Sequence, residues 1–480
     1  MLPALRPDPN PRGHANSRMK ARSLFLALAA FGGSLGLSLP VAAQDRAADI
    51  AGEIGTSTAL LQARITPAQR LAAGIPDGVE GWARFEAADN PQFVRPVVSE
   101  WLMIKPLNDY VVKFDLGKVH ERYNELDGGK QYFWRIRYGI NPSKLTDGPV
   151  HTFKTLSGAL ASRAVRLAVV QGIDTAAPGA AAKIAQVAAT KPDYVVFLGN
   201  SVAYDHAPAA TTIDAMRAKW HDLLGEAKVI ELLNNTGTYW LKNDRDFRFN
   251  DADTTGDQLP SAELGATVFK EQVPVVDPRD PSSLTFRVEQ ATRDLALWML
   301  EVRDYRSPNQ AADNKDKSLW GTSQAEWLQR SLVSSSTPFK IVVQPTPVLG
   351  PDLPGSSDSH AGTGGFRTER QAFLDHAKAN KLGERGLLIL TGTDWQYHSV
   401  AADGVEEISV GSLTSPLAGA VPAPDASLKQ PFGPAKAAAG FALIDIAPAA
   451  DGKPAKLTVS LVSADNGEVV YSTSRNATKP

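Results

Sequence analysis

The stretch from Val165 to Asn200, VRLAVVQGIDTAAPGAAAKIAQVAATKPDYVVFLGN, decides the fold of this chain. Val165–Val170 and Tyr194–Leu198 are short, uninterrupted apolar runs, which is typical of strands that are buried on both faces. The segment between them, Ala180–Ala189, has the composition of a helix. Alternating strands and helices of this kind build layered α/β domains, so we predict an α/β architecture for this part of the chain.

The same alternation continues along the chain and defines a domain predicted over residues 164–474. Further helices are predicted over Ile213–Leu224, Ser323–Leu332 and Glu369–Ala379, and further strands over Leu295–Val302, Lys340–Val343 and Leu387–Leu390. The end of the chain is predicted to be β-structure, with strands over Glu407–Val410, Gly440–Ile446, Lys456–Val462 and Glu468–Thr473. Asn466-Gly467 is a hairpin-turn signal between the last two strands. Pro416–Ala437, rich in alanine and proline, is predicted to be a mobile surface loop.

Residues 48–155 are predicted to form a separate β-sandwich. Short segments alternate apolar and polar residues there, and turn-forming clusters such as Asp127-Gly128-Gly129 separate several of them. The predicted strands are Ala59–Ile65, Gly81–Glu86, Tyr110–Asp115 and Tyr132–Tyr138. Several short strands at this spacing are typical of a sandwich. A linker is expected near Leu156–Arg163.

The first 43 residues have the pattern of an export signal. A basic patch of Arg18, Lys20 and Arg22 precedes an apolar run from Leu24 to Leu39, and the small residues Val41-Ala42-Ala43 follow. This pattern predicts a secretory signal peptide that is cleaved after Ala43, with a periplasmic or secreted protein as the result. An uncleaved membrane anchor is the alternative. No other stretch is apolar enough to span a bilayer, so no membrane span is expected after cleavage.

Composition narrows the chemistry. The chain has 480 residues, a formal net charge of −2 and no cysteine. Disulfides, thiolate zinc sites and cysteine nucleophiles are therefore excluded, and any metal ion must be held by oxygen or imidazole ligands. A nucleic-acid partner is not expected, because such proteins carry a basic surplus.

Polar side chains cluster directly after the predicted strands. Asp174 follows the first strand, Asn200 the second, and Asn243-Asp244-Arg245-Asp246 comes shortly after Tyr239-Trp240-Leu241. Asp304 and Arg306 follow Leu295–Val302, and Asp394 and His398 follow Leu387–Leu390. Several strand ends that deliver carboxylates to one edge of a sheet are a common way to build a dinuclear metal site in hydrolases.

The order and wording of these segments resemble the PhoD-like alkaline phosphatase/phosphodiesterase family. The matching strings include Pro192–Gly199, Val302–Asn309, Pro345–Asp352, Asp358-Ser359-His360 and Trp395-Gln396-Tyr397-His398-Ser399. The resemblance implies a fibronectin-III-like sandwich followed by an α/β/β/α metallophosphatase domain. It also implies hydrolysis of phosphomonoesters or phosphodiesters with calcium and iron ions.

The resemblance also suggests roles for individual residues. It places Asp174, Asn200, Asp244, Asp394 and His360 at metal-ligand positions, and Asn200, Asp244, Arg245 and His398 at catalytic positions. Arg303 and Arg306 are candidates for binding the phosphate of a substrate. Arg303 is equally well explained as a structural partner of Asp304.

The chain departs from the family pattern in four motifs. The family's cysteine after the first strand is missing from Gln171-Gly172-Ile173-Asp174, and the aspartate of the second motif is replaced by Asn200. In the third motif Asn243 stands for an acid and Arg245 for a histidine, and in the fourth, Gly392-Thr393-Asp394 is one residue short and lacks a histidine. Asparagine brings no charge to a metal, and arginine cannot ligate one.

Three interpretations follow from these departures. In the first, the protein has reduced or lost phosphoesterase activity and retains no metal ions. In the second, it is an active enzyme with a rebuilt, mononuclear site that uses Asp174, Asp244, Asp394, His360 or His398. In the third, it is an exported module that binds a phosphate ester or another anion without cleaving it. Arg245 would then either bind the anion or pair with Asp244, Asp246 or Asp174.

Overall fold

A computed structural model describes residues 47–66, 78–117, 125–280, 284–416 and 419–478. The predicted signal peptide, residues 1–43, lies outside the described residues. Within the described part, strands of the predicted sandwich and of the predicted α/β domain belong to one compact unit, Ala43–Pro480.

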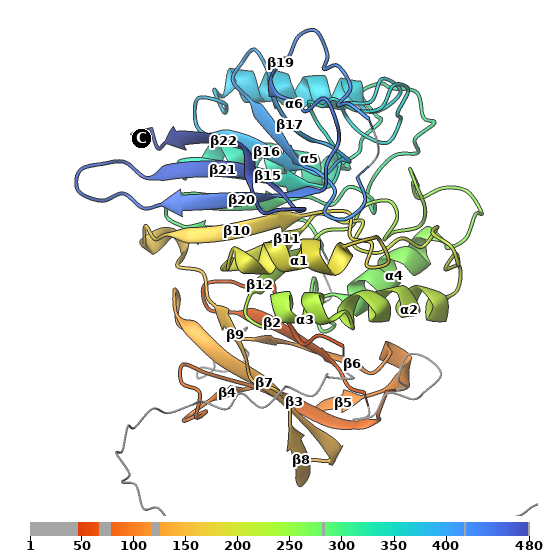
Figure 1. Cartoon of the computed structure of the whole chain (residues 1–480), viewed down its shortest axis with the longest axis vertical. Helices are drawn as coiled ribbons and strands as arrows, with labels where there is room; N and C mark the ends of the chain where they lie inside the picture. The colour runs from red at the N-terminus through yellow and green to blue at the C-terminus, as the bar shows by residue number, and fades with distance from the viewer. Residues whose placement is uncertain (1–46, 67–77, 118–124, 281–283, 417–418, 479–480) are drawn as a thin grey trace, which may run out of the picture. The chain divides into compact units, whose positions relative to one another are not determined.

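A nine-stranded sheet has the segment from Val165 to Asn200 near its centre (Figure 1). Its parallel core consists of β10 (Val165–Val170), β11 (Tyr194–Phe197) and β12 (Gly237–Trp240). Antiparallel strands extend it on one side: β20 (Gly440–Ala447), β21 (Lys456–Ser463) and β22 (Val469–Asn476). On the other side follow β1 (Ile50–Gly52), β2 (Ala59–Arg64) and β6 (Val111–Leu116). The uninterrupted apolar runs predicted the central strands correctly.

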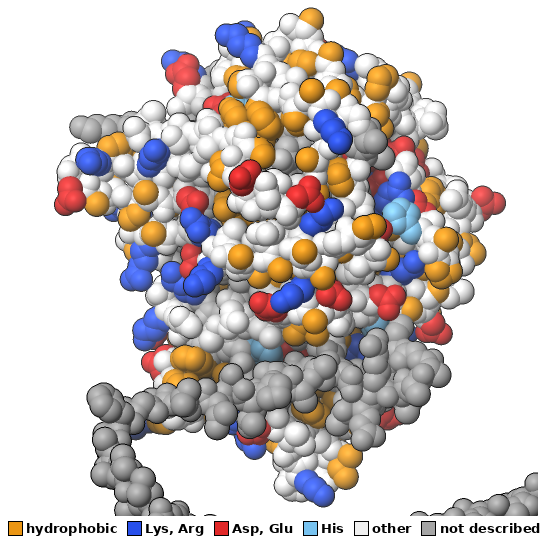
Figure 2. Space-filling view, viewed as in Figure 1, with side chains coloured by type: hydrophobic (Ala, Val, Ile, Leu, Met, Phe, Trp, Pro, Cys, Tyr) orange, Lys and Arg blue, Asp and Glu red, His pale blue; other side chains and the backbone are white. Residues whose placement is uncertain are grey.

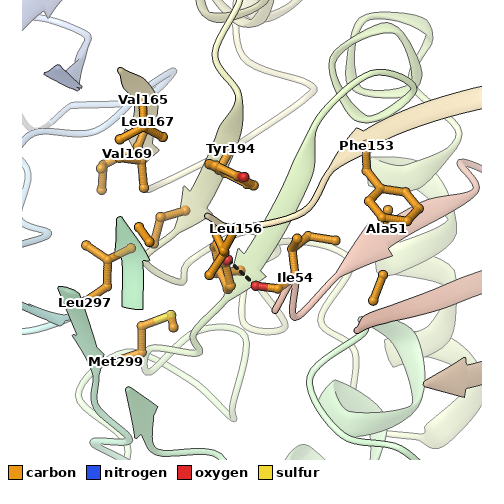
Figure 3. Close-up of a cluster of buried hydrophobic side chains, with 14 of the residues drawn as sticks. Ala51, Ile54, Phe153, Leu156, Val165, Leu167, Val169, Tyr194, Leu297 and Met299 are labelled. Carbon is orange, nitrogen blue, oxygen red and sulfur yellow. Dashed lines mark hydrogen bonds between the residues drawn. The ribbon is translucent and has the colours of Figure 1, made fainter. Parts of the chain in front are cut away.

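A seven-stranded sheet packs against the nine-stranded sheet. Its order is β13 (Arg287–Thr292), β14 (Leu295–Met299), β15 (Phe339–Gln344), β16 (Leu387–Thr391), β18 (Glu406–Val410), β17 (Gln396–Val400) and β19 (Lys429–Phe432). Figure 3 shows Val169 from one sheet with Leu297 and Met299 from the other. These side chains are at most 2% exposed, so the two sheets enclose a dry core.

Helices cover the outer faces of both sheets. Those against the nine-stranded sheet are α1 (Ala180–Ala189), α2 (Ile213–Leu224), α3 (Ala227–Leu233) and α4 (Ala262–Gln272). Those against the seven-stranded sheet are α5 (Thr322–Ser334) and α6 (Arg367–Ala379). The result is the predicted α/β/β/α layering, and the predicted fold class is confirmed.

The N-terminal β-structure is a sandwich that shares a sheet with the rest of the molecule. Its outer sheet contains β3 (Gly81–Ala88), β4 (Val97–Val98), β5 (Leu102–Ile104), β7 (Gln131–Asn141), β8 (Lys144–Asp147) and β9 (His151–Lys154). Phe85, Trp134 and Phe153 belong to the same buried cluster as Leu61 of β2. Since β1 pairs in parallel with β12, the inner sheet of the sandwich continues into the nine-stranded sheet. Short 3-10 turns, η1 (Pro106–Asn108) and η2 (Gly158–Leu160), complete this region.

Three sequence-based expectations meet different outcomes. The loop expected over Pro416–Ala437 contains β19, which pairs with β17, and Pro431 is tolerated because β19 is an edge strand. The strand expected to reach Val302 ends at Met299, where the backbone N–H of Glu301 turns to the side chain of Gln324. The turn at Asn466-Gly467 joins β21 and β22 as predicted.

The surface fits the nearly neutral net charge. On the face shown in Figure 2, lysine, arginine and carboxylate side chains are intermixed. Among the described residues, no helix is both long and apolar enough to cross a membrane.

Candidate functional site

A pocket of about 680 Å³ lies where strands of both sheets end. Residues that follow β10, β11 and β12 line it on one side, and residues that follow β15, β16 and β18 line it on the other. Five of the residues singled out from the sequence are in its wall: Asp174, Asn200, Asp244, Arg245 and Asp394. Carboxyl ends of parallel strands are where α/β proteins place their ligands.

The loops after β11 and β12 touch at the centre of the pocket. Gly199 has a φ of 93°, and a Cβ there would lie 2.4 Å from the backbone nitrogen of Asn243, so only glycine fits. Asn200 adopts a left-handed φ of 50°. Its Oδ1 accepts a hydrogen bond of 3.3 Å from the backbone N–H of Arg245. The Asn200 side chain therefore holds the neighbouring loop through a neutral amide.

Arg245 pairs with partners other than those expected. Its Nη1 donates to Asp205 at 2.8 Å and its Nη2 donates to Asn250 at 2.8 Å. The expectation that it pairs with Asp244, Asp246 or Asp174 is wrong, because the guanidinium lies along the loop that carries Asp205. Asp246, behind it, is fully buried and accepts from the backbone N–H groups of Ser201 and Asn243.

Three carboxylates form a cluster in the pocket wall. Oxygens of Asp244, Asp251 and Asp358 all lie within 4.8 Å of one another. Burial, together with the charges of Asp358 and Asp244, raises the pKa of Asp251 to about 6. Burial likewise raises the pKa of Asp246 to about 7, and the neighbouring Asp244 charge adds to the effect. We call this part of the pocket the acidic wall (Asp244, Asp251, Asp358). Burial and the neighbouring carboxylates favour the protonated form of Asp251 there.

Two buried arginines balance Asp358 from behind. Arg303 donates to its two carboxylate oxygens at 2.8 and 2.7 Å, and Arg306 approaches it at 2.9 Å. Burial alone would raise the pKa of Asp358, but the two guanidinium groups lower it below the ordinary value. Arg303 is 0% exposed and Arg306 4% exposed, and neither lines the pocket. Their predicted contact with a substrate phosphate has no support in this arrangement.

The expected pair between Arg303 and Asp304 is also replaced. Asp304 lies 2.8 Å from the buried Lys242, whose Nζ also donates to Glu301 at 2.6 Å. Besides Asp358, the Nη1 of Arg303 donates to the backbone oxygen of Ala252, and its Nη2 donates to the side-chain oxygen of Asn243. Asn243 therefore faces Arg303.

The two candidate histidines lie outside the pocket lining. His360 Nε2 bonds Glu369 at 2.8 Å, and the ring packs against Trp320. His398 on β17 bonds Glu406 at 3.0 Å and the hydroxyl of Tyr471 at 2.8 Å. Both rings are buried in these pairs. The structure therefore does not bring His360 and His398 to Asp244, although both had been expected to contribute to the site.

Several pocket residues were missed from the sequence. Asp251 stands in a loop without a recognised motif, and Asp352 and Asp358 belong to matching strings but had been given no role in the site. Gln171, Thr346 and Trp395 also line the pocket. The signal that could have found Asp251 is its position five residues beyond Asp246, in the same loop after β12.

Comparison with known proteins places this geometry in a family context. Residues 240–430 match the family model described as PhoD-like phosphatase. The solved structure of PhoD superposes with a TM-score of 0.69 at 16% identity, covering 90% of each chain. The PhoD-like resemblance is confirmed. The purple acid phosphatase PPD1 from yellow lupin (Lupinus luteus) seeds superposes with a TM-score of 0.61 at 12% identity, covering 90% of this chain and 74% of the other. No curated protein matches the sequence.

Metal ions are implied for the PhoD-like family, and the donors in this pocket do not fit a pair of them. The sequence has no thiolate, Asn200 is neutral, and Arg245, next to Asp244 in the chain, cannot ligate a cation. Asp358 is already bonded by Arg303 and Arg306. Multivalent cations need several anionic or imidazole donors to offset the cost of dehydration. No catalytic step through two metal ions follows from these residues.

Proposed function

We propose that this chain is an exported PhoD-like protein in which metal-dependent phosphoester hydrolysis is strongly reduced or lost. The proposal is supported by the partners of three residues that the resemblance places in the site. Arg245 donates to Asp205 and Asn250. His360 and His398 each bond a glutamate and do not line the pocket. A fixed guanidinium beside Asp244 opposes the binding of a cation there.

Anion binding, the third interpretation, receives less support from the charge of the pocket. Seven aspartates line it: Asp174, Asp222, Asp244, Asp251, Asp352, Asp358 and Asp394. Against these carboxylates, the described residues of the lining include one lysine, Lys219, and one arginine, Arg245, and Arg245 is paired with Asp205. A phosphate ester without a cation would be repelled in such surroundings.

A rebuilt single-metal site is the second candidate, because the acidic wall brings three carboxylates within 4.8 Å. Oxygen ligands of this kind suit calcium or magnesium. Against it stand Arg303 and Arg306, which already neutralise Asp358. Metal content therefore separates the two candidates directly.

The test combines metal analysis with turnover. Chain purified in its exported form is measured by mass spectrometry for bound metal, then assayed with bis(p-nitrophenyl) phosphate in the presence of calcium, iron or manganese. We expect less than one tightly bound ion per chain and a rate at least on the order of 10³-fold below that of an active PhoD, the loss typical when one key stabilising group is removed.

The control is Asp244→Asn, which removes a carboxylate of the acidic wall. Residual turnover that disappears in this variant originates in the pocket, and turnover that persists comes from a contaminant. Two bound ions per chain with a rate near that of active PhoD would sink the proposal. One bound ion, lost in Asp244→Asn together with activity, would establish the rebuilt site.

A further inference from the structure

Three residues of the pocket lining each have a buried side-chain atom that could form a hydrogen bond but has no partner in the described part of the chain. Gln171, Thr346 and Trp395 are 5%, 4% and 4% exposed. Gln171 Oε1, Thr346 Oγ1 and Trp395 Nε1 have no hydrogen-bond partner among the described residues. A buried polar atom left unpaired costs roughly 1–3 kcal/mol. We call these three residues the neutral floor.

The neutral floor is built by three strand ends that meet around Gly392. Gln171 follows β10, and its Cγ would lie 2.7 Å from a Cβ at position 392. Thr346 follows β15, beside Pro345, whose oxygen accepts from the backbone N–H of Gly392 at 3.2 Å. Trp395 follows β16, and its backbone N–H is held by Thr393 Oγ1 at 3.1 Å. The three side chains are thus fixed by the sheet and line one pocket.

The chemistry of the three atoms selects the kind of ligand. Gln171 Oε1 can only accept a hydrogen bond, Trp395 Nε1 can only donate one, and a threonine hydroxyl can do both. A phosphodiester or a fully ionised phosphate offers only acceptors, so it would leave Gln171 Oε1 unpaired. A metal ion would be opposed by the N–H of Trp395. A hydroxyl group both donates and accepts, so hydroxyls satisfy all three atoms.

We infer that the pocket binds a neutral sugar, with its hydroxyl groups on the neutral floor. Carboxylates of Asp174, Asp352 and Asp394 line the same pocket, and a carboxylate accepts hydrogen bonds from hydroxyl groups. A volume of about 680 Å³ lies in the range of pockets for small ligands, which is about 300–1,000 Å³. This binding needs neither metal nor hydrolysis, so it goes beyond the proposed function and stands apart from it.

The experiment measures binding of neutral sugars to the exported chain in the presence of EDTA. D-glucose, D-mannose, N-acetyl-D-glucosamine and maltose are titrated separately and followed by calorimetry and saturation-transfer NMR. We expect saturable binding of at least one of them with a dissociation constant near or below about 1 mM, and weaker binding of its 6-phosphate where one exists.

A matched pair of variants locates the site. Thr346→Val removes the unpartnered hydroxyl in the pocket, and Thr391→Val removes a hydroxyl that is equally buried and unpartnered but does not line the pocket. We expect Thr346→Val to weaken binding on the order of tenfold and Thr391→Val to leave it unchanged. Gly392→Ala, which displaces Gln171, is the second pocket variant, and melting temperatures show that each variant is folded.

Three outcomes would overturn the inference. The first is no saturable binding of any of the four sugars at concentrations up to roughly 50 mM, far above the millimolar range of weak specific ligands. The second is tighter binding of the phosphorylated sugar, or binding that EDTA abolishes, which would assign the pocket to anions or metal. The third is an equal effect of Thr346→Val and Thr391→Val. Because the binding of the neutral sugars is measured without metal and without turnover, its failure leaves the metal and turnover measurements unaffected.

Discussion

The acidic wall and the neutral floor lie in one pocket but differ in whether the protein supplies partners for their polar groups. In the acidic wall, Asp358 is paired with two arginines that are buried inside the protein. In the neutral floor, Gln171 and Trp395 carry polar atoms without partners among the described residues. Buried charges that are compensated internally serve structure, whereas buried polar atoms that remain unpaired need another partner, which the inferred sugar would supply.

The same difference bears on the proposed loss of metal-dependent hydrolysis. A dinuclear site would need the carboxylates of the acidic wall for metal ions, but here Arg303 and Arg306 provide the positive charge from within the protein. The wall can then remain acidic without a cation, and the inferred sugar binding would use the strand ends around Gly392 instead.

The largest expected effect comes from breaking the internal compensation of the acidic wall. Arg303→Met leaves Asp358 buried beside Asp244 and Asp251 with one arginine instead of two. We expect the free energy of unfolding to fall by about 3–5 kcal/mol, the usual loss when one partner of a buried pair is removed. Urea denaturation followed by circular dichroism measures it.

The control for this variant is Arg330→Ala, since Arg330 is 76% exposed in its pair with Glu326. We expect less than about 0.5 kcal/mol for it. If Arg303→Met lost no more stability than Arg330→Ala, the acidic wall would not depend on its arginines, and a metal ion would become the better explanation of the carboxylate cluster.

A smaller effect is expected from the proton that Asp246, close to Asp244 of the acidic wall, takes up. Burial raises the pKa of Asp246 from 3.8 to about 7, so the folded state binds a proton that the unfolded state releases between these values. The contribution of Asp246 to stability is therefore greatest below about pH 4 and is lost as the pH rises to about 7.

Asp246→Asn keeps an acceptor for one of the backbone N–H groups and cannot ionise. Compared with the unaltered chain, this variant should gain about 1–3 kcal/mol of relative stability between pH 4 and pH 7, at about 1.4 kcal/mol per pKa unit discounted for relaxation. Denaturation midpoints across this range measure the difference. Parallel pH profiles of the two proteins would show that Asp246 stays ionised.

The sequence predicted the layers of the fold and placed several candidate residues at the pocket, but it did not predict the acidic wall as a cluster. Apolar runs such as Val165–Val170 carry a local signal that tertiary context does not override, so the central strands were correct. Asp174 and Asn200 were found because residues directly after such strands reach the sheet edge. Asp358 was missed because 114 residues separate it from Asp244, and only the packing of the two sheets brings them together.

Side-chain direction was the other limit. His398 lies on β17, where successive side chains point to opposite faces, and a shift of one residue decides whether a histidine faces the pocket. Its partners Glu406 and Tyr471 come from β18 and β22, and their pairing with β17 and β21 could not be read from the local sequence. Arg303 was likewise expected to face a substrate phosphate or Asp304, but its side chain points to Asp358 behind the pocket wall.

The smallest expected effect comes from Arg245, at the border of the acidic wall. The side chains of Arg245 and Asp205 are 29% and 24% exposed, so solvent screens their pair. Arg245→Ala should lower the free energy of unfolding by only about 0.5–1 kcal/mol and should leave sugar binding within about twofold, because the neutral floor is built by other strands. Denaturation and sugar titration of this variant measure both quantities. A loss of sugar binding as large as that in Thr346→Val would mean that the two sides of the pocket act as one site, since removing a charge from one side would then disable recognition on the other.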